Sequence, residues 1–343
     1  MPKKYDNIRI VEVDGSLLLG ASGYRIFTMD ESGSSKYVAK IDDPVHAFLS
    51  KFSRTRRMFR AEVHRLLTLS NGNRICIARK GIFLQEKDSK HFVKTFRVPR
   101  GSRPMNICED SDGAIYFGEY YPNPERGEVH VYGSFDGCHT WQIVYTFGAG
   151  TIRHIHGIYK DPWSGKLWIT TGDENGECLI AFTDDRFRTV TIAAGGDQRY
   201  RTCTLLFLED RIIYGTDSPC RINSIYSMSR KDYALTELKR VQGSVINSCM
   251  TGDHLFVSTT VEPSEVNTDR DSYLWYSYKG LEWKIIARYK KDKLNINLFQ
   301  FGNIRFPHYR NTPASALYFS GHALEEIDGC TVEIDFNELS ENR

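Results

Sequence analysis

The sequence predicts an all-β protein that forms a single seven-bladed β-propeller over residues 1–343, with mostly four-stranded antiparallel blades. The first observation behind this prediction is a repeated signature of three apolar residues followed by a small one. It occurs seven times, at intervals of 40 to 62 residues, and periods in this range are typical of propeller blades or another repeat array. The seven copies begin at Leu17, Ile75, Ile115, Leu167, Ile212, Leu255 and Leu317.

The second observation is a turn signal shortly before several of these signatures. Each such pair predicts a hairpin between an inner strand and the second strand of a blade. Continuous apolar runs suit strands that are buried on both faces, as where one blade packs on the next. A β-sandwich, or several small β domains, is the alternative, but seven near-regular units fit one propeller better. The turn signals are Asp14-Gly15, Asn71-Gly72, Asp112-Gly113, Ser164-Gly165 and Gly252-Asp253.

The two ends of the chain predict how the ring closes. The last unit is short after Leu317, so Ile8 to Val13 either supplies its missing strand or starts the first blade. Both options join the termini. Amphipathic helices are scarce, and the best candidate is the stretch from about Val45 to Leu67.

Composition limits the partners of the protein. With 45 basic and 43 acidic residues the net charge is +2, which argues against general nucleic-acid binding. No apolar run reaches the length of a membrane span, and the first residues lack an apolar signal core. The eight cysteines are scattered and form no C-x-x-C pair. We expect a cytoplasmic protein with free thiols and no nucleotide cofactor; the alternative is the mature form of a secreted protein.

Arginines recur in successive loops that enter the inner strands. In a propeller these entry loops share one face with the loops between second and third strands, so the two sets converge on one mouth. The guanidinium group binds carboxylate, sulfate or phosphate in a bidentate way, and we expect an acidic ligand to be clamped there. The alternative is that the arginines pair with neighbouring acidic side chains such as Glu174. The predicted ligand-binding residues are Arg60, Arg103, Arg153, Arg199, Arg201, Glu119, Tyr121 and Asp173.

His154 and His156 form the densest cluster of titratable residues. On a strand both point to the same side, so they can hold a metal ion or serve as acid and base; the alternative is a pair of packed, hydrogen-bonded histidines. Gln300 and His322 come from other blades and would complete a set of ligands for one divalent metal ion. Tyr120 is the candidate proton donor, because a nearby arginine can lower the pKa of a tyrosine.

The segment Ser134-Phe135-Asp136-Gly137-Cys138-His139-Thr140-Trp141 resembles the Asp box, S-x-D-x-G-x-T-W, of sialidase-like (BNR-repeat) propellers. In this motif Asp and Ser hold a tight hairpin, Gly permits the turn, and Trp packs beneath the neighbouring strand. A weaker copy lies at Ser277 to Trp283, and Phe96-Arg97-Val98-Pro99 looks like the F-R-I-P motif of the same family. The resemblance implies a carboxylate bound by three arginines, a tyrosine–glutamate nucleophile and an aspartate acid.

Seven-bladed polysaccharide lyases are a second comparison, at the level of the fold. In some of those enzymes His and Gln hold a divalent metal ion and His and Arg serve the chemistry, and in others His, Tyr and Arg do so. We therefore expect a carbohydrate-active enzyme for an acidic, uronate-containing glycan, acting by β-elimination or hydrolysis. The alternatives are a sialidase-like glycoside hydrolase and a non-catalytic propeller that binds a glycan or a protein. The sequence specifies neither the sugar nor the oligomeric state.

Overall fold

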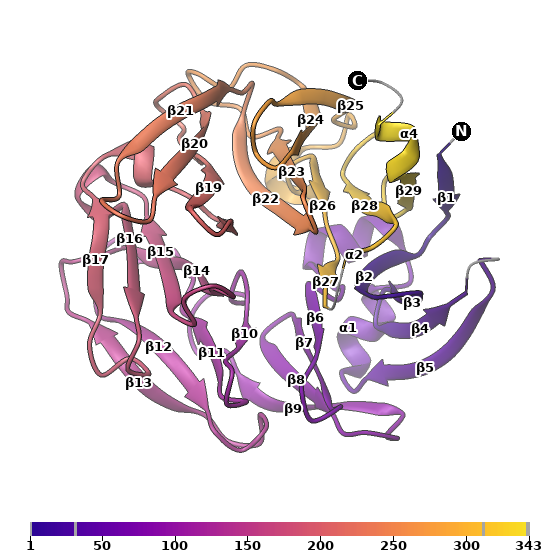
Figure 1. Ribbon diagram of the computed structural model, residues 1–343. Coiled ribbons are helices and arrows are strands. Elements are labelled where there is room, and N and C mark those ends of the chain that lie inside the picture. The colour runs from indigo at the N-terminus through magenta and orange to yellow at the C-terminus, as the bar shows by residue number, and fades with distance from the viewer. Residues whose placement is uncertain (1, 31–32, 311–312, 341–343) are drawn as a thin grey trace.

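The computed structural model describes residues 2–30, 33–310 and 313–340, and shows β-sheets arranged in a ring around a central axis (Figure 1). Antiparallel neighbours along the chain group the strands into consecutive sets of four. The first two sets are β2 (Arg9–Asp14), β3 (Leu17–Ser22), β4 (Arg25–Met29) and β5 (Ser35–Ile41), then β6 (Arg65–Thr68), β7 (Arg74–Ala78), β8 (Gly81–Gln85) and β9 (His91–Arg97).

Three further sets follow, each a separate four-stranded sheet. They are β10 (Cys108–Glu109), β11 (Ile115–Gly118), β12 (Val129–Ser134) and β13 (Gln142–Phe147); β14 (His154–Lys160), β15 (Leu167–Gly172), β16 (Leu179–Thr183) and β17 (Thr191–Gly195); and β18 (Leu206–Phe207), β19 (Arg211–Gly215), β20 (Ser224–Ser229) and β21 (Leu235–Arg240).

The last two sets complete the ring. They are β22 (Ser244–Thr251), β23 (His254–Thr260), β24 (Asp271–Tyr278) and β25 (Lys284–Lys290), then β26 (Asn303–Arg305), β28 (Ala316–His322), β29 (Thr331–Asp335) and β1 (Lys3–Tyr5). The final sheet thus takes its outer strand from the N-terminus: Lys4 lies opposite Val332. Ile8 to Val13 starts the first set, and the closing strand is the shorter segment before it. The fold is all-β and propeller-like.

The first two sets are joined into one nine-stranded sheet by a short parallel contact. Lys40 lies opposite His91, and Ile41 opposite Phe92. The strand β27 (His308–Tyr309) adds to the same sheet beside β2, again in parallel.

Each apolar signature occupies the second strand of its set, as the sequence predicted. Ile115–Gly118, for example, is buried at every residue. The side chains pack between neighbouring sheets: Ile75 and Ile82 of one set share a cluster with Ile115 and Phe117 of the next. The core is therefore distributed around the ring, which explains why these strands are apolar on both faces.

The predicted helix from Val45 to Leu67 is wrong as a single element. It is divided into α1 (Pro44–Leu49) and α2 (Ser53–Phe59). The side chain of Asp43 caps α1 by accepting a hydrogen bond from the His46 amide. Arg60 ends α2 in the left-handed conformation, and the apolar pair Leu66 and Leu67 belongs to β6. The short elements α3 (Ile296–Phe299), α4 (Phe336–Ser340) and the 3₁₀ turns η1 (Asn175–Glu177) and η2 (Gln198–Tyr200) complete the secondary structure of the described residues.

The hairpin between β12 and β13 is held by the side chain of Asp136. Its Oδ1 accepts hydrogen bonds from the Ser134 hydroxyl at 2.9 Å, the His139 amide at 3.0 Å and the Thr140 amide at 2.9 Å. Its Oδ2 accepts a bond of 2.6 Å from the Thr140 hydroxyl. The Trp141 ring packs against Phe117 with a centroid distance of 5.1 Å.

A second turn has the same hydrogen bonds and was missed by the sequence analysis. Between β16 and β17, Asp185 accepts from the Thr183 hydroxyl at 2.8 Å, and from the Thr189 amide and hydroxyl at 3.0 and 2.7 Å. Threonine replaces the serine of the motif, which retains the hydroxyl group. The segment from Ser277 to Trp283 also forms a hairpin, but lysine stands at the aspartate position and the Ser277 hydroxyl is buried without a hydrogen-bond partner.

Candidate functional site

The candidate site lies at the end of the ring where the entry loops meet the loops between second and third strands. Antiparallel pairing within each set brings both kinds of loop to the same end of the sheets. His154 is the first residue of β14, and Asp173 directly follows its partner strand β15. A register shift between Ile155 and Gly157 marks a bulge around His156, and such bulges re-aim side chains.

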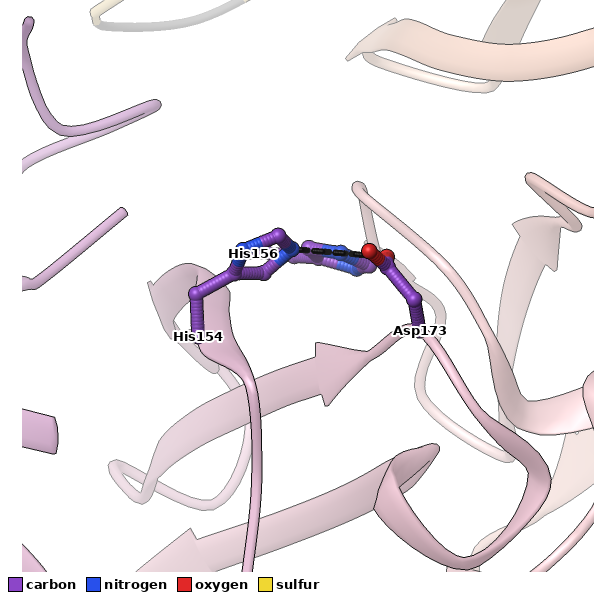
Figure 2. Close-up of side chains that lie close together, drawn as sticks. All are labelled: His154, His156 and Asp173. Carbon is purple, nitrogen blue, oxygen red and sulfur yellow. Dashed lines mark hydrogen bonds and ion pairs between the residues drawn. The ribbon is translucent and has the colours of Figure 1, made fainter. Parts of the chain in front are cut away.

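His154, His156 and Asp173, here called the histidine cluster, lie close together; both histidines are buried and Asp173 is partly buried (Figure 2). The Nε2 atoms of the two histidines are 3.1 Å apart. Asp173 Oδ1 lies 3.4 Å from each of them. The side chains of His154 and His156 are 7% and 2% exposed, so bulk water does not solvate these nitrogens.

Backbone carbonyl groups fix the orientation of both imidazole rings. Nδ1 of His154 lies 3.0 Å from the Tyr121 carbonyl oxygen, and Nδ1 of His156 lies 3.0 Å from that of Thr202. A carbonyl oxygen only accepts hydrogen bonds, so each Nδ1 carries the proton. Burial lowers the pKa of His154 below its usual value, and the neighbouring His156 acts in the same direction.

Two arginines form ion pairs with the carboxylate of Asp173. Arg153 Nη1 contacts Oδ2 at 3.0 Å, and Arg201 Nη2 contacts Oδ1 at 3.0 Å. Burial alone would raise the pKa of Asp173, but its contacts with His154, His156 and Arg201 hold that pKa well below the usual range. Asp173 is therefore ionised and is the centre of this site.

Gly172 leaves the space that the site needs. A β-carbon at this position would lie 2.7 Å from Cε1 of His156 and 3.4 Å from Cγ of Arg201. Side-chain carbons do not approach so closely, so any larger residue would displace the His156 ring.

A second group on the axis consists of Arg9, Arg103, Arg305, His322 and Glu62, the arginine cluster. Glu62 Oε1 accepts from Arg305 Nη1 at 2.6 Å and lies 3.7 Å from His322 Nδ1, while Oε2 is 3.8 Å from Arg9 Nη1. Burial would raise the pKa of Glu62, but these cations hold it well below its usual value.

Positive charge is in excess in the arginine cluster. Burial lowers the pKa of Arg9 and of Arg103, and the charge of Arg305 acts in the same direction on both; guanidinium groups nevertheless remain charged at neutral pH. Nη1 of Arg9, Nη1 of Arg103 and Nε2 of His322 are buried without a hydrogen-bond partner.

The Tyr120 ring packs against the histidine cluster. The Tyr120 ring is 4.4 Å from that of His154, centroid to centroid. The charge of Arg60 interacts with Tyr120. Burial raises the pKa of Tyr120, with Cys203 and Asp217 acting in the same direction. The expectation that arginine lowers this pKa is therefore wrong: the phenol stays protonated at neutral pH and can act as a proton donor.

Glu262 is an acidic group to which the sequence analysis assigned no role. Burial raises its pKa to about 7, with Asp217 acting in the same direction. The charge of Arg201 lowers this pKa and that of Asp173 raises it. Its position in a loop between second and third strands is the sequence signal that indicates it.

Several predicted residues have other partners. Glu119 forms an ion pair with Arg100, whose Nη1 also donates to the Tyr121 hydroxyl at 2.7 Å. Arg199 contacts Asp197 at 2.9 Å. The alternative of arginines paired with acidic neighbours thus holds for Arg100 and Arg199, and for Arg153 and Arg201 through Asp173.

Gln300 and His322 do not join the histidine cluster. The amide of Gln300 donates to the Arg57 carbonyl at 2.5 Å, and His322 faces Glu62. The predicted four-residue metal site therefore needs correction, because Gln300, the C-cap residue of α3, and His322, which ends β28, have partners outside the histidine cluster.

A cavity of about 660 Å³ lies along the axis on the side of the opposite turns. It is lined by residues of the first-to-second-strand turns, such as Asp110 and Pro162, and by inner-strand residues such as Arg65 and Cys249. No motif in the sequence indicated it, because it forms where inner strands of different sets face one another.

The eight cysteines are all unpaired, as expected. Within the described part of the chain, none of the helices has the length and apolar character that crossing a membrane requires.

No protein-family profile matches the chain, and no curated protein matches it. Solved structures do match, at low identity. A chain of a mitotic checkpoint complex is similar with a TM-score of 0.55 and 10% identity, over 96% of this chain and 90% of that one.

Two GH74 enzymes are also similar. That of Niastella koreensis has a TM-score of 0.53 and 11% identity, over 81% of this chain and 45% of its own. An ancestral GH74 enzyme has a TM-score of 0.53 and 12% identity, over 94% of this chain and 44% of its own. The chain thus spans less than half the length of these two enzymes, and at such identities the matches show the propeller-like fold alone.

Proposed function

We propose that the protein is a seven-bladed β-propeller enzyme that acts on an acidic, uronate-containing glycan at the end of the ring where the two clusters lie. The count of seven treats β2–β5 and β6–β9 as separate blades. The observation that carries the proposal is the excess of buried positive charge in the arginine cluster, where Nη1 of Arg9 and Nη1 of Arg103 make no hydrogen bond.

A ligand carboxylate would supply the acceptors that these donors lack. An unpaired buried donor loses its hydration without compensation, whereas a hydrogen bond to a charged group contributes about 1.5–3 kcal/mol. Arg153 and Arg201, around Asp173, add positive charge at the histidine cluster.

β-Elimination needs a base, a proton donor and a positive partner for the developing anion. Glu262, with a pKa near neutrality, is the proposed base, and Tyr120 the proposed donor to the leaving oxygen. An arginine that binds the uronate carboxylate would stabilise the intermediate. A sialidase-like hydrolysis is the alternative chemistry. Because Glu119 is engaged by Arg100, its tyrosine–glutamate pair would be Tyr120 with Glu262.

A non-catalytic propeller that binds a glycan or a protein is the second candidate function. The favouring observation is that Asp173 already neutralises Arg153 and Arg201, as a structural ion-pair network would.

The test is incubation with a panel of uronate polysaccharides. Ultraviolet absorbance of an unsaturated uronide reports elimination, and new reducing ends without that absorbance report hydrolysis. Loss of product by Glu262→Gln, with glycan binding retained, supports the enzyme. Absence of both signals across the panel, together with glycan binding, supports the second candidate; absence of binding as well rejects both.

A further inference from the structure

We propose that His154, His156 and Asp173 bind one divalent metal ion of the zinc type, through the two Nε2 atoms and Oδ1. The proposal does not depend on the glycan. It replaces the ligand set expected from the sequence, in which Gln300 and His322 complete the site.

The tautomers of the two histidines are the first evidence for a metal site. Both Nδ1 atoms donate to backbone carbonyl groups, so in each neutral ring the lone pair is on Nε2. These two lone pairs face each other across 3.1 Å. A cation placed beside both nitrogens relieves the repulsion.

The distances among the three ligand atoms fit such a cation. A triangle with sides of 3.1, 3.4 and 3.4 Å has a circumradius of about 1.9 Å. This is slightly less than the Zn–N and Zn–O distances of about 2.0–2.2 Å. One point close to the plane of the triangle therefore lies at bonding distance from all three atoms, without movement of any side chain.

The residues around the three ligands have features that are typical of metal sites. Carbonyl groups hold the far nitrogen of each imidazole, as is usual for metal-bound histidines. Arg153 and Arg201 orient the carboxylate of Asp173 but also repel a cation. Asp217 offsets part of this repulsion, since its carboxylate lies 3.8 Å from Arg201 Nε.

Three protein ligands leave a coordination position for water or substrate, the arrangement typical of catalytic rather than structural zinc. Two imidazoles and one carboxylate favour Zn²⁺ or Co²⁺ over Mg²⁺ and Ca²⁺, which prefer oxygen ligands.

The first measurement uses the full chain, purified without chelator and without a histidine-rich tag. After incubation with Zn²⁺ and desalting, elemental analysis should give about one zinc per chain. Calorimetric titration should show binding of Zn²⁺ and none of Mg²⁺ or Ca²⁺. Co²⁺ should give visible absorption bands of a low-coordinate nitrogen and oxygen site.

The variants separate the two ligand sets. His156→Phe replaces the imidazole with an aromatic ring that has no nitrogen atoms. This variant should bind Zn²⁺ at least about a hundredfold more weakly. His322→Phe is the matched control, a buried histidine of the arginine cluster, and should bind Zn²⁺ as the wild type does. Circular dichroism and thermal unfolding without metal establish that each variant is folded.

Two results would overturn the proposal: wild-type protein that binds no Zn²⁺ at millimolar concentration, or binding that survives His156→Phe. In the first case the two Nε2 atoms share a proton instead. Should His156→Phe not fold, Gly172→Ala decides, since its β-carbon displaces His156 while all three ligands remain; unchanged Zn²⁺ affinity would then reject the site. These titrations contain no glycan, so their failure leaves the proposed function standing.

Discussion

Replacing Glu62 with Gln tests whether the arginine cluster has an excess of buried charge. The substitution keeps the shape of the side chain but removes the carboxylate that contacts Arg305, Arg9 and His322. Breaking a buried ion pair by removing one partner costs about 3–5 kcal/mol. The Glu62 and Arg305 side chains are 12% and 13% exposed, so we expect the lower end of that range, about 3 kcal/mol.

This loss converts into a measurable shift of the melting temperature. An unfolding entropy of about 2.1 cal/mol/K per residue over 343 residues gives about 0.7 kcal/mol/K. Glu62→Gln should therefore melt about 4 °C below the wild type by calorimetry near neutral pH. Because the folded-state pKa of Glu62 is lowered, its stabilisation is present above the carboxyl pKa of the unfolded chain and is lost as pH falls.

Glu125→Gln is the control, because Glu125 is exposed and its removal leaves no buried charge unpaired. If Glu62→Gln melts within about 1 °C of this control, solvent or bound anions neutralise the arginines, and the reasoning about buried charge is wrong. Addition of an acidic oligosaccharide should raise the melting temperature of the wild type in the same experiment.

Arg153→Ala should weaken binding of the acidic glycan roughly ten- to a hundredfold, since it removes a charge-assisted bond. Arg199→Ala, which removes an arginine paired with Asp197, should leave the affinity unchanged. Equal effects of both variants in a calorimetric titration would contradict the role of Arg153 in binding the ligand carboxylate. Glu262→Gln should change how stability depends on pH. The raised pKa means that the folded wild type retains a proton, so its free energy of unfolding falls as pH rises from about 4.5 to about 7. In urea unfolding, the free energy of unfolding of the variant should lack the decrease that Glu262 causes over this range. If the free energies of both proteins fall equally with pH, the prediction is wrong. Asp136→Ala should cost about 1–2 kcal/mol in the same urea assay, because its hydrogen bonds hold one exposed hairpin, and the glycan affinity should be unchanged; a change in affinity would place that turn at the site.

The sequence could predict the strands because their signals are local. Each apolar signature is a strand between two packed sheets, and glycine turns such as Asp112-Gly113 mark the hairpins before them. His154 and His156 could be paired for the same reason, since two residues of one strand share a face. The prediction of one helix was wrong where its apolar pattern continued into a strand. Leu66 and Leu67 are apolar because they are buried in β6, not because they lie on a helix.

The remaining contacts of the two clusters depend on pairing between strands that are far apart in the sequence. Arg9 and Arg305 meet at Glu62 only because the ring closes, and nothing near any of them in sequence indicates the other two. Gln300 and His322 were assigned to the histidines by residue type, but Gln300 at the end of α3 contacts Arg57, and His322 at the end of β28 faces Glu62.

The sequence by itself determined the repeat, the burial of the second strands and the face on which His154, His156 and Arg153 lie. These follow from periodicity and turn chemistry, which act within a few residues. The tertiary structure decided that Asp173 joins the histidines, that Glu119 is engaged by Arg100, and that excess positive charge gathers on the axis. Such pairings depend on how each loop is aimed across the ring, because electrostatic and metal-ligand contacts form between side chains that only the closed set of sheets brings within a few ångströms.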